Sequence, residues 1–329
     1  MKIAFHVYQF TFRGSEVALF DYALYNRRIL NNISIIVVPK NQKTHPDVNV
    51  LKKFEQEFTI IYYNDINDLE KICKEEKVDA LYTIKYGTND GLVLKDIPTW
   101  VHCVFTTDQP HGSVYAGVSD SVSQKNIDNI KHPVVNHIIH LPEISSDFRK
   151  ELGIPKTAMV FGRHGGTDTF NIPYVKKAII KILEEREDVY FIFAVKPDIL
   201  NDLEHKRVIY LESFTDSRIK RKFINTCDAM IHACTLGESF GLSILEFSYC
   251  NKPVITWNGG LWHKQHLTNL GDKALLYNNE KDLVDIFRNI SKLDSSDLNY
   301  KCITDNFTAN KIMKQFEDVF IKTLKNDTH

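Results

Sequence analysis

The stretch Gly237-Glu238-Ser239-Phe240-Gly241-Leu242-Ser243-Ile244-Leu245-Glu246 follows a short apolar run at 229–232 and continues into a helical segment. A strand, a glycine-containing turn and a helix in this order form the repeating unit of a parallel sheet covered by helices. The first N–H groups of such a helix are unpaired and lie at the positive end of its dipole, which favours a bound phosphate. Gly241 lets the backbone approach that phosphate closely. The stretch therefore predicts an α/β unit with an anion site at the start of its helix.

Two carboxylates lie on either side of this turn. Glu238 precedes the helix, where it can accept hydrogen bonds from sugar hydroxyls next to a bound phosphate. Glu246 lies about one turn inside the helix, and its carboxylate can hold the diol of a ribose. A purely structural alternative makes Glu238 a charge that complements the helix dipole and Glu246 a solvated helix residue.

The alternation of short apolar runs with helical segments extends along the whole chain. In the first half we expect strands at 2–7, 34–38, 59–62, 80–84, 100–105, 114–118 and 134–139, a helix capped by Ser15 and a helix at 66–76. The polar segment 141–147 is the candidate linker. In the second half we expect strands at 159–162, 189–195, 207–211, 229–232 and 253–256, helices at 173–185, 217–225 and 242–249, and a last helix at 306–324.

This pattern predicts two tandem Rossmann-like, doubly wound α/β domains that face a shared cleft, with a C-terminal helix. The expected boundaries are 1–142 for the N-terminal domain, 143–305 for the C-terminal domain and 306–329 for the helix, which we expect to pack back on the N-terminal domain. The length of 329 residues agrees with two domains, because it is more than one hydrophobic core usually serves.

Composition excludes several classes of protein. The 41 Lys+Arg residues balance 42 Asp+Glu residues, so no general attraction to nucleic acid is expected. No apolar run reaches the roughly 18 to 20 residues of a membrane span, and the N-terminus is too quickly polar for a secretory signal. The six cysteines contain no Cys-x-x-Cys pair, and a His232–Cys234 pair has no second pair at ligand spacing, so we expect free thiols, no metal site and a cytoplasmic location.

Two short basic clusters, at 176–177 and 220–222, are expected to be solvated helix faces. The alternative is that they give weak peripheral contact with a membrane carrying a lipid acceptor.

The sequence around the two glutamates resembles the retaining glycosyltransferases of family 4, which have the GT-B fold. The resemblance rests on the Glu-x7-Glu spacing with Phe-Gly-Leu inside it, and it continues through Asn251-Lys252-Pro253-Val254-Ile255 and Asn258-Gly259-Gly260. It implies that Glu238 is catalytic and contacts the donor sugar, and that Glu246 holds the ribose. It further implies that the backbone of Ser239, Phe240, Gly241 and Leu242 holds the donor diphosphate.

A second part of the resemblance lies at the end of the predicted strand 159–162. Arg163 matches the arginine with which the family binds the donor diphosphate, as a guanidinium can do in bidentate fashion. The family usually has a lysine a few residues later, where this chain reads Asp168-Thr169-Phe170-Asn171. Lys196, Lys85 and His164 remain open as the group that replaces its charge.

The remaining candidates come from the N-terminal half. Gly14 and Ser15 match a small-residue loop that contacts the donor phosphate in the family. His111 is our candidate for the family's catalytic histidine, with His102 as the second choice. Lys85 and Asp108 follow neighbouring strands and are candidates for contact with the acceptor.

The resemblance implies a retaining, metal-independent glycosyltransferase, hexosyl or related, without a cofactor. It would move a sugar from a nucleoside-diphosphate donor, such as a UDP- or GDP-sugar, to a glycan, a lipid or another hydroxyl acceptor. One alternative is a nucleotide-sugar epimerase of the same fold, in which Glu238 and His111 transfer protons. The other is a nucleotide-sugar-binding protein with little turnover, suggested by the absent lysine.

Overall fold

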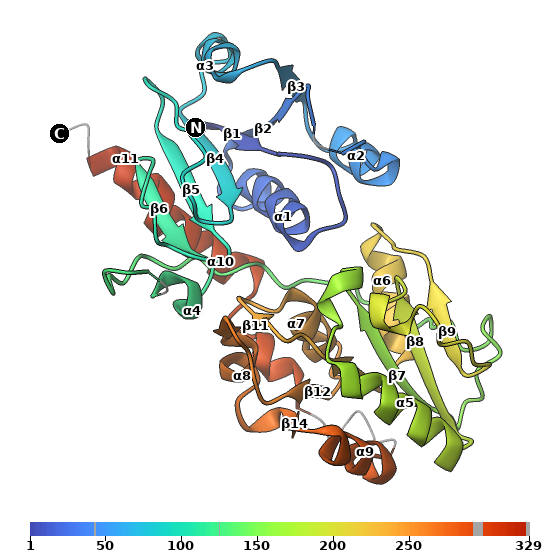
Figure 1. Ribbon diagram of the computed structural model, residues 1–329. Helices are drawn as coiled ribbons and strands as arrows, with labels where there is room; N and C mark the ends of the chain where they lie inside the picture. Colours follow the sequence, from blue (N-terminus) through green and yellow to red (C-terminus); the bar gives the residue numbers. More distant parts are fainter. Residues whose placement is uncertain (43, 125, 292–298, 327–329) are drawn as a thin grey trace. The chain divides into compact units, whose positions relative to one another are not determined.

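The computed structural model describes residues 1–42, 44–124, 126–291 and 299–326 (Figure 1). The chain forms two compact units, one of residues 1–138 together with the segment from Asn306 onward, the other of residues 139–305. Each unit contains a six-stranded parallel sheet. The prediction of two doubly wound α/β domains is confirmed.

The first unit is built on a sheet of order β3-β2-β1-β4-β5-β6. Its strands are β1 (Lys2–His6), β2 (Ile33–Pro39), β3 (Ile60–Tyr63), β4 (Ala80–Lys85), β5 (Thr99–Cys103) and β6 (Val114–Gly117), and its helices are α1 (Gly14–Arg28), α2 (Val48–Glu55), α3 (Ile66–Glu75) and α4 (Asp120–Ser123). Successive residues of β1 enter different cores, because side chains alternate across a strand: Phe5 packs on one face and Ala4 on the other.

The C-terminal segment completes the core of the first unit. It comprises α10 (Ala309–Phe316), a π-helical turn (Glu317–Ile321) and α11 (Lys322–Asn326). Phe316 is fully buried, and its ring stacks on those of Phe5, at 6.5 Å, and Tyr22, at 5.5 Å. The helix expected at 306–324 is thus interrupted by a π-helical turn and begins at Ala309.

The second unit is built on a sheet of order β14-β12-β10-β7-β8-β9. Its strands are β7 (Met159–His164), β8 (Val189–Ala194), β9 (Val208–Leu211), β10 (Ala229–His232), β12 (Val254–Trp257) and β14 (Leu275–Tyr277), and a two-stranded sheet joins β11 (Gly237–Glu238) to β13 (His263–Lys264). Its helices are α5 (Pro173–Glu185), α6 (Ser217–Thr226), α7 (Leu242–Tyr249), α8 (Gln265–Leu270) and α9 (Glu280–Asn289). The elements that the sequence pattern missed are short or highly charged: α2, α4, α8, α9, β11, β13 and β14.

Two local predictions are wrong. The segment 134–139 is no strand: Val134 makes a single bridge to Gly117, and the N–H of Asn136 then donates to the side chain of Gln315, at 3.0 Å. Ser15 is not the cap of α1, because the helix already begins at Gly14 and the Ser15 hydroxyl donates to the carboxylate of Glu16, at 2.8 Å.

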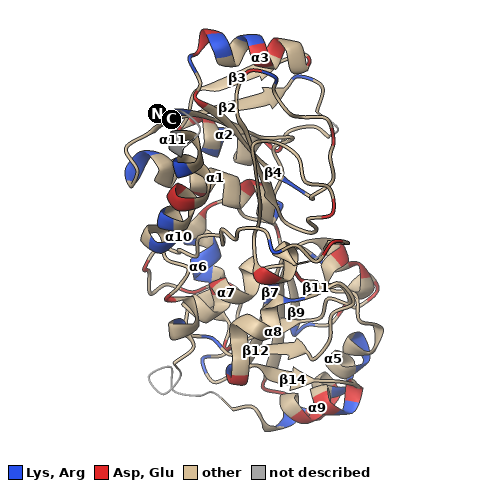
Figure 2. Cartoon of the chain, turned by 90° about the vertical axis from the view of Figure 1, so that its left-hand side faces the viewer, with Lys and Arg blue, Asp and Glu red and all other residues tan. Residues whose placement is uncertain are grey.

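Charged residues of both signs are interspersed on the outer helices, as α3 and α9 show in Figure 2. Within the described residues, no helix combines the length and the apolar character that crossing a membrane requires.

Candidate functional site

The start of α7 has the backbone geometry of an anion site. Gly241 is the N-cap residue, with φ of 90°, a left-handed conformation that disfavours any residue with a Cβ. Since glycine has no side chain, the N-cap residue itself makes no side-chain hydrogen bond to the first N–H groups of α7. Gly237 has a separate role, because a Cβ there would lie 1.8 Å from the carbonyl oxygen of His263, on the partner strand β13.

Glu238 is held from within the unit by a buried histidine. Nε2 of His232, the last residue of β10, lies 3.1 Å from Oε1 of Glu238, and Nδ1 of the same ring lies 2.8 Å from the hydroxyl of Thr256. Burial raises the pKa of the Glu238 carboxyl, but the hydrogen bond from His232 and the nearby charges, that of Arg163 among them, together lower it by more, so the net pKa lies below the usual value. The carboxylate, with 27% of its side chain exposed, is ionised at neutral pH.

Glu246 lies inside a charged cluster that the sequence did not reveal. Its Oε1 accepts a hydrogen bond from Nζ of Lys220, on α6, at 2.6 Å, and its Oε2 lies 3.1 Å from Nε2 of His164, at the end of β7. Burial raises the pKa of Glu246, but the charge of Lys220 and the contact with His164 together lower it by more, and the resulting pKa is about 2. Glu246 is therefore a buried anion, and the structural alternative of a solvated helix residue is wrong.

The same contact corrects the interpretation of the basic cluster at 220–222. Only 15% of the Lys220 side chain is exposed, so the prediction of a solvated face is wrong for this residue. Lys222, two positions on, pairs with the exposed carboxylate of Glu151 at 2.5 Å, and Lys176 of the other cluster pairs with exposed Asp202 at the same distance.

Arg163 is buried at the end of β7 with part of its guanidinium unpaired. Nη2 donates to the carbonyl of Gly166 and to the hydroxyl of Thr169, each at 2.6 Å, while Nη1 is buried and has no hydrogen-bond partner among the described residues. Burial lowers the pKa of Arg163 to about 10, so the charge persists at neutral pH. A buried N–H donor without an acceptor is costly, and a bound anion would satisfy it.

The three candidates for the absent lysine charge already have partners in their own units. Lys196 pairs with Glu204 at 2.6 Å and lies over the ring of Tyr210, and His164 contacts Glu246. Lys85 belongs to the first unit. Thr169, in the stretch where the family has its lysine, instead anchors Arg163.

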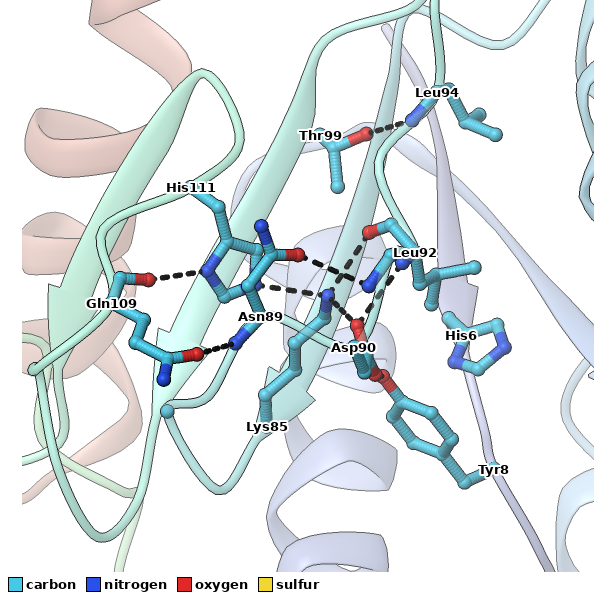
Figure 3. A network of polar contacts seen from close by, with 12 residues as sticks. His6, Tyr8, Lys85, Asn89, Asp90, Leu92, Leu94, Thr99, Gln109 and His111 are labelled. Atoms are coloured by element: carbon cyan, nitrogen blue, oxygen red, sulfur yellow. Dashed lines mark hydrogen bonds and ion pairs between the residues drawn. The ribbon is translucent and has the colours of Figure 1, made fainter.

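Lys85 and His111, both candidates from the sequence, meet in the first unit (Figure 3). Nζ of Lys85 donates to Oδ1 of Asp90 at 2.5 Å, to the carbonyl of Leu92 at 3.0 Å and to Nε2 of His111 at 3.1 Å. Nδ1 of His111 donates to the carbonyl of Gln109 at 2.6 Å. Both ring nitrogens of His111 are thus hydrogen-bonded, and burial lowers the pKa of both His111 and Lys85.

Sequence reasoning missed Asp90 and Tyr8, two further members of this network. Asp90, in the polar turn after β4, accepts from Lys85 and, through its other oxygen, from the hydroxyl of Tyr8. Asp108 does not join it and accepts from Thr106 instead. His102, the second choice for the catalytic histidine, is a core residue whose Nδ1 lies 2.7 Å from the hydroxyl of Tyr82.

Gly14 and Ser15 form the first turn of α1 in the first unit. The N-cap of this helix is Arg13, which makes no side-chain capping hydrogen bond. The two residues therefore lie at the N-terminus of a helix and not in the loop that was expected. A helix N-terminus can also bind an anion.

Comparison with solved structures identifies the fold. A glycosyltransferase from Rickettsia africae ESF-5 matches with a TM-score of 0.74 at 16% identity, over 99% of both chains. Anabaena Alr3699/HepE, in complex with UDP-glucose, matches with a TM-score of 0.72 at 16% identity, over 98% of this chain and 100% of that chain. The fold is GT-B. A putative UDP-N-acetylglucosamine 2-epimerase from Listeria monocytogenes shares the GT-B fold less closely, with a TM-score of 0.56 at 12% identity, over 98% of this chain and 97% of that chain.

The GT-B fold was expected from the resemblance. At 12–16% sequence identity, the structural similarity shows the fold and nothing about the activity. No protein-family profile matches the sequence. No curated protein matches it either.

Proposed function

We propose that the chain is a retaining glycosyltransferase that moves a sugar from a nucleoside-diphosphate donor to a hydroxyl acceptor. The observation that carries the proposal is the grouping of anion-binding features on neighbouring elements of the second unit. These are the uncapped start of α7, the unpaired Nη1 of Arg163 and the two glutamates on either side of Gly241. The GT-B neighbour HepE, in complex with UDP-glucose, supports a UDP-sugar as the first donor to test.

The chemistry we propose is electrostatic. The N–H groups of α7 and the guanidinium of Arg163 stabilise the departing diphosphate, while Glu246 holds the ribose. Glu238 contacts the sugar whose bond to the diphosphate breaks. The acceptor hydroxyl attacks from the face that the diphosphate leaves and gives its proton to the departing phosphate oxygen, so the anomeric configuration is retained. These groups supply the positive charge that a divalent ion gives in other transferases, so we propose a metal-independent reaction.

Binding and transfer test the proposal in two steps. Calorimetry with UDP, GDP, UDP-glucose and GDP-mannose is expected to give saturable binding for one base. NMR of the transfer product is expected to show the anomeric configuration of the donor, and activity is expected to survive EDTA. If no nucleotide binds, the proposal is wrong; if activity is lost in EDTA and restored by Mn²⁺, only the metal-free mechanism is wrong.

The matched variants for this test are Arg163→Ala and Lys176→Ala. Arg163 carries the unpaired buried donor, whereas Lys176 lies on α5 and pairs with exposed Asp202. We expect nucleotide binding to fall in the first variant alone.

An epimerase is the second candidate, since a putative epimerase shares the fold. Both ring nitrogens of His111 are hydrogen-bonded within the first unit. This observation argues against an epimerase in which His111 transfers protons. Conversion of the donor sugar without any acceptor would favour the epimerase. Acceptor-dependent release of the nucleoside diphosphate would favour the transferase.

A further inference from the structure

The cluster of Glu246, Lys220 and His164 joins three separate elements of the second unit. Glu246 comes from α7, Lys220 from α6 and His164 from the end of β7. The three side chains are 8%, 15% and 13% exposed. The cluster is therefore an internal arrangement of charge, with a small opening to solvent.

Stability alone does not account for such a cluster. Removing a carboxylate and an ammonium from water is expensive, and apolar side chains of similar volume often stabilise a fold as well or better. The surroundings would accept such a replacement, since the ring of His164 stacks on Phe247 with centroids 5.8 Å apart. We therefore look for a role of this buried ion pair in binding a ligand.

The position along α7 fits the sugar of a nucleotide whose phosphates lie at the helix start. Glu246 is five residues beyond the N-cap residue Gly241, which corresponds to about 7 Å along the helix axis. That separation is comparable to the length of a nucleotide between its phosphates and the ribose hydroxyls.

The cluster leaves hydrogen-bonding capacity for a ligand. A carboxylate offers about four lone-pair positions, of which the hydrogen bond from Lys220 takes one at Oε1, while Nε2 of His164 lies 3.1 Å from Oε2 without forming a hydrogen bond. Lys220 has three N–H donors, of which one goes to Glu246. A ribose diol supplies two O–H donors to the carboxylate and hydroxyl oxygens to the ammonium.

Resting on the proposed function, we propose that Lys220 and His164 position the carboxylate of Glu246 so that the site selects ribonucleotides over 2′-deoxyribonucleotides. Lys220 is a positioning residue in this proposal, and the ribose hydroxyls are the groups recognised. A 2′-deoxynucleotide would leave a buried lone pair of Glu246 unsatisfied, which costs at least about tenfold in affinity. Without Lys220 the carboxylate loses its fixed orientation, and the selectivity falls.

The test is the ratio of the dissociation constants of 2′-deoxy-UDP and UDP, repeated with 2′-deoxy-GDP and GDP, measured by calorimetry on the full chain. For the wild-type protein we expect a ratio of about 10 or more for the base that binds. In Lys220→Met, which keeps the apolar stem, the ratio is expected to fall below about 3. Lys222→Met is the matched control, because Lys222 lies on the same helix and pairs with exposed Glu151, and its ratio is expected to equal that of the wild type.

Two further variants keep the proposal falsifiable if Lys220→Met does not fold. His164→Phe preserves the stacking on Phe247 and is expected to lower the ratio, whereas Lys220→Arg keeps the charge and is expected to preserve it.

A purely structural cluster gives a different result. Lys220→Met or His164→Phe would then change both dissociation constants by the same factor, and the unchanged ratio would overturn this inference while leaving the transferase intact. A wild-type ratio near 1 would overturn it as well. Absence of binding for all four nucleotides would instead overturn the proposed function, and this inference with it.

Discussion

The imidazole of His232 connects Glu238 to the sheet, with Nε2 3.1 Å from Oε1 of Glu238 and Nδ1 2.8 Å from the hydroxyl of Thr256. The backbone carbonyl of His232 in turn accepts a hydrogen bond from the buried hydroxyl of Tyr277, at 2.8 Å. The carboxylate that we propose to contact the donor sugar is therefore oriented by a rigid strand, although it lies on a short loop strand itself. Such support is what a group acting on a transition state requires.

His232→Phe tests this support. The substitution removes the hydrogen bond to Glu238 and keeps a buried aromatic ring, so we expect kcat for donor turnover to fall by about tenfold or more. The affinity for the free nucleoside diphosphate should stay within about twofold, because it lacks the sugar that Glu238 contacts. His232→Gln retains an N–H donor and should recover part of kcat. Equal losses of kcat and nucleotide affinity in His232→Phe would mean a general distortion of the site.

The two glutamates should separate in kinetics. Ribose does not react, so Glu246→Gln removes binding that the ground state and the transition state share, and we expect a higher KM for the donor with kcat largely unchanged. Gln is preferable to Ala because it retains an acceptor for Lys220. Glu238→Ala should lower kcat and leave nucleotide binding nearly unchanged. The assignments are reversed if calorimetry finds bare nucleotide binding abolished by Glu238→Ala and preserved in Glu246→Gln.

Arg163→Ala is expected to weaken binding of the nucleoside diphosphate by about 2–4 kcal/mol, the range for truncating one member of a desolvated charge pair. Arg163→Lys keeps the charge but has no planar fork, so an intermediate loss is expected. Calorimetry measures both. Wild-type affinity in Arg163→Ala would show that another group carries the diphosphate charge.

His102 should contribute to the acid sensitivity of the first unit. Burial lowers its pKa to about 3, against about 6.5 for an unfolded chain, so protons bind preferentially to the unfolded state. Above pH 6.5 this histidine causes no loss of stability. As the pH falls from 6.5 toward 3, it lowers the free energy of unfolding by about 1.4 kcal/mol for each pH unit. Urea unfolding at pH 7 and pH 5 should therefore show a smaller loss in His102→Phe than in the wild type. Identical losses would indicate that other groups dominate.

Phe316→Ala should destabilise the first unit by about 3–5 kcal/mol, the cost of removing a fully buried phenyl ring. The ring packs against Phe5, Tyr22 and Trp100, which belong to three elements of that unit. Denaturant unfolding measures the change, with exposed Lys311→Ala as the control on the same helix. A change below about 1 kcal/mol would mean that the C-terminal segment contributes little to this core.

Local sequence determined the alternation of strands and helices and the turn at Gly241. Buried parallel strands appear as short apolar runs, and a left-handed turn before a helix requires glycine at a fixed place. The spacing of Glu238 and Glu246 follows from the same stretch, and so does the resemblance that led to the GT-B fold. Lys85, His111 and Arg163 became candidates because they lie at the ends of predicted strands or in the loops that follow them and, for His111 and Arg163, because they match positions of the family.

Tertiary structure alone decided which side chains meet. Glu246 contacts Lys220 and His164 because helix α6 and strand β7 are brought to α7 by the sheet order, and local patterns carry no information about such pairings. For the same reason, a lysine that lies in a basic cluster on a helix was predicted to face solvent. The segment 134–139 was predicted to be a strand, whereas the N–H of Asn136 donates to the side chain of Gln315. Burial and partnership are set by packing between distant segments, and the free energy of a charge depends on both.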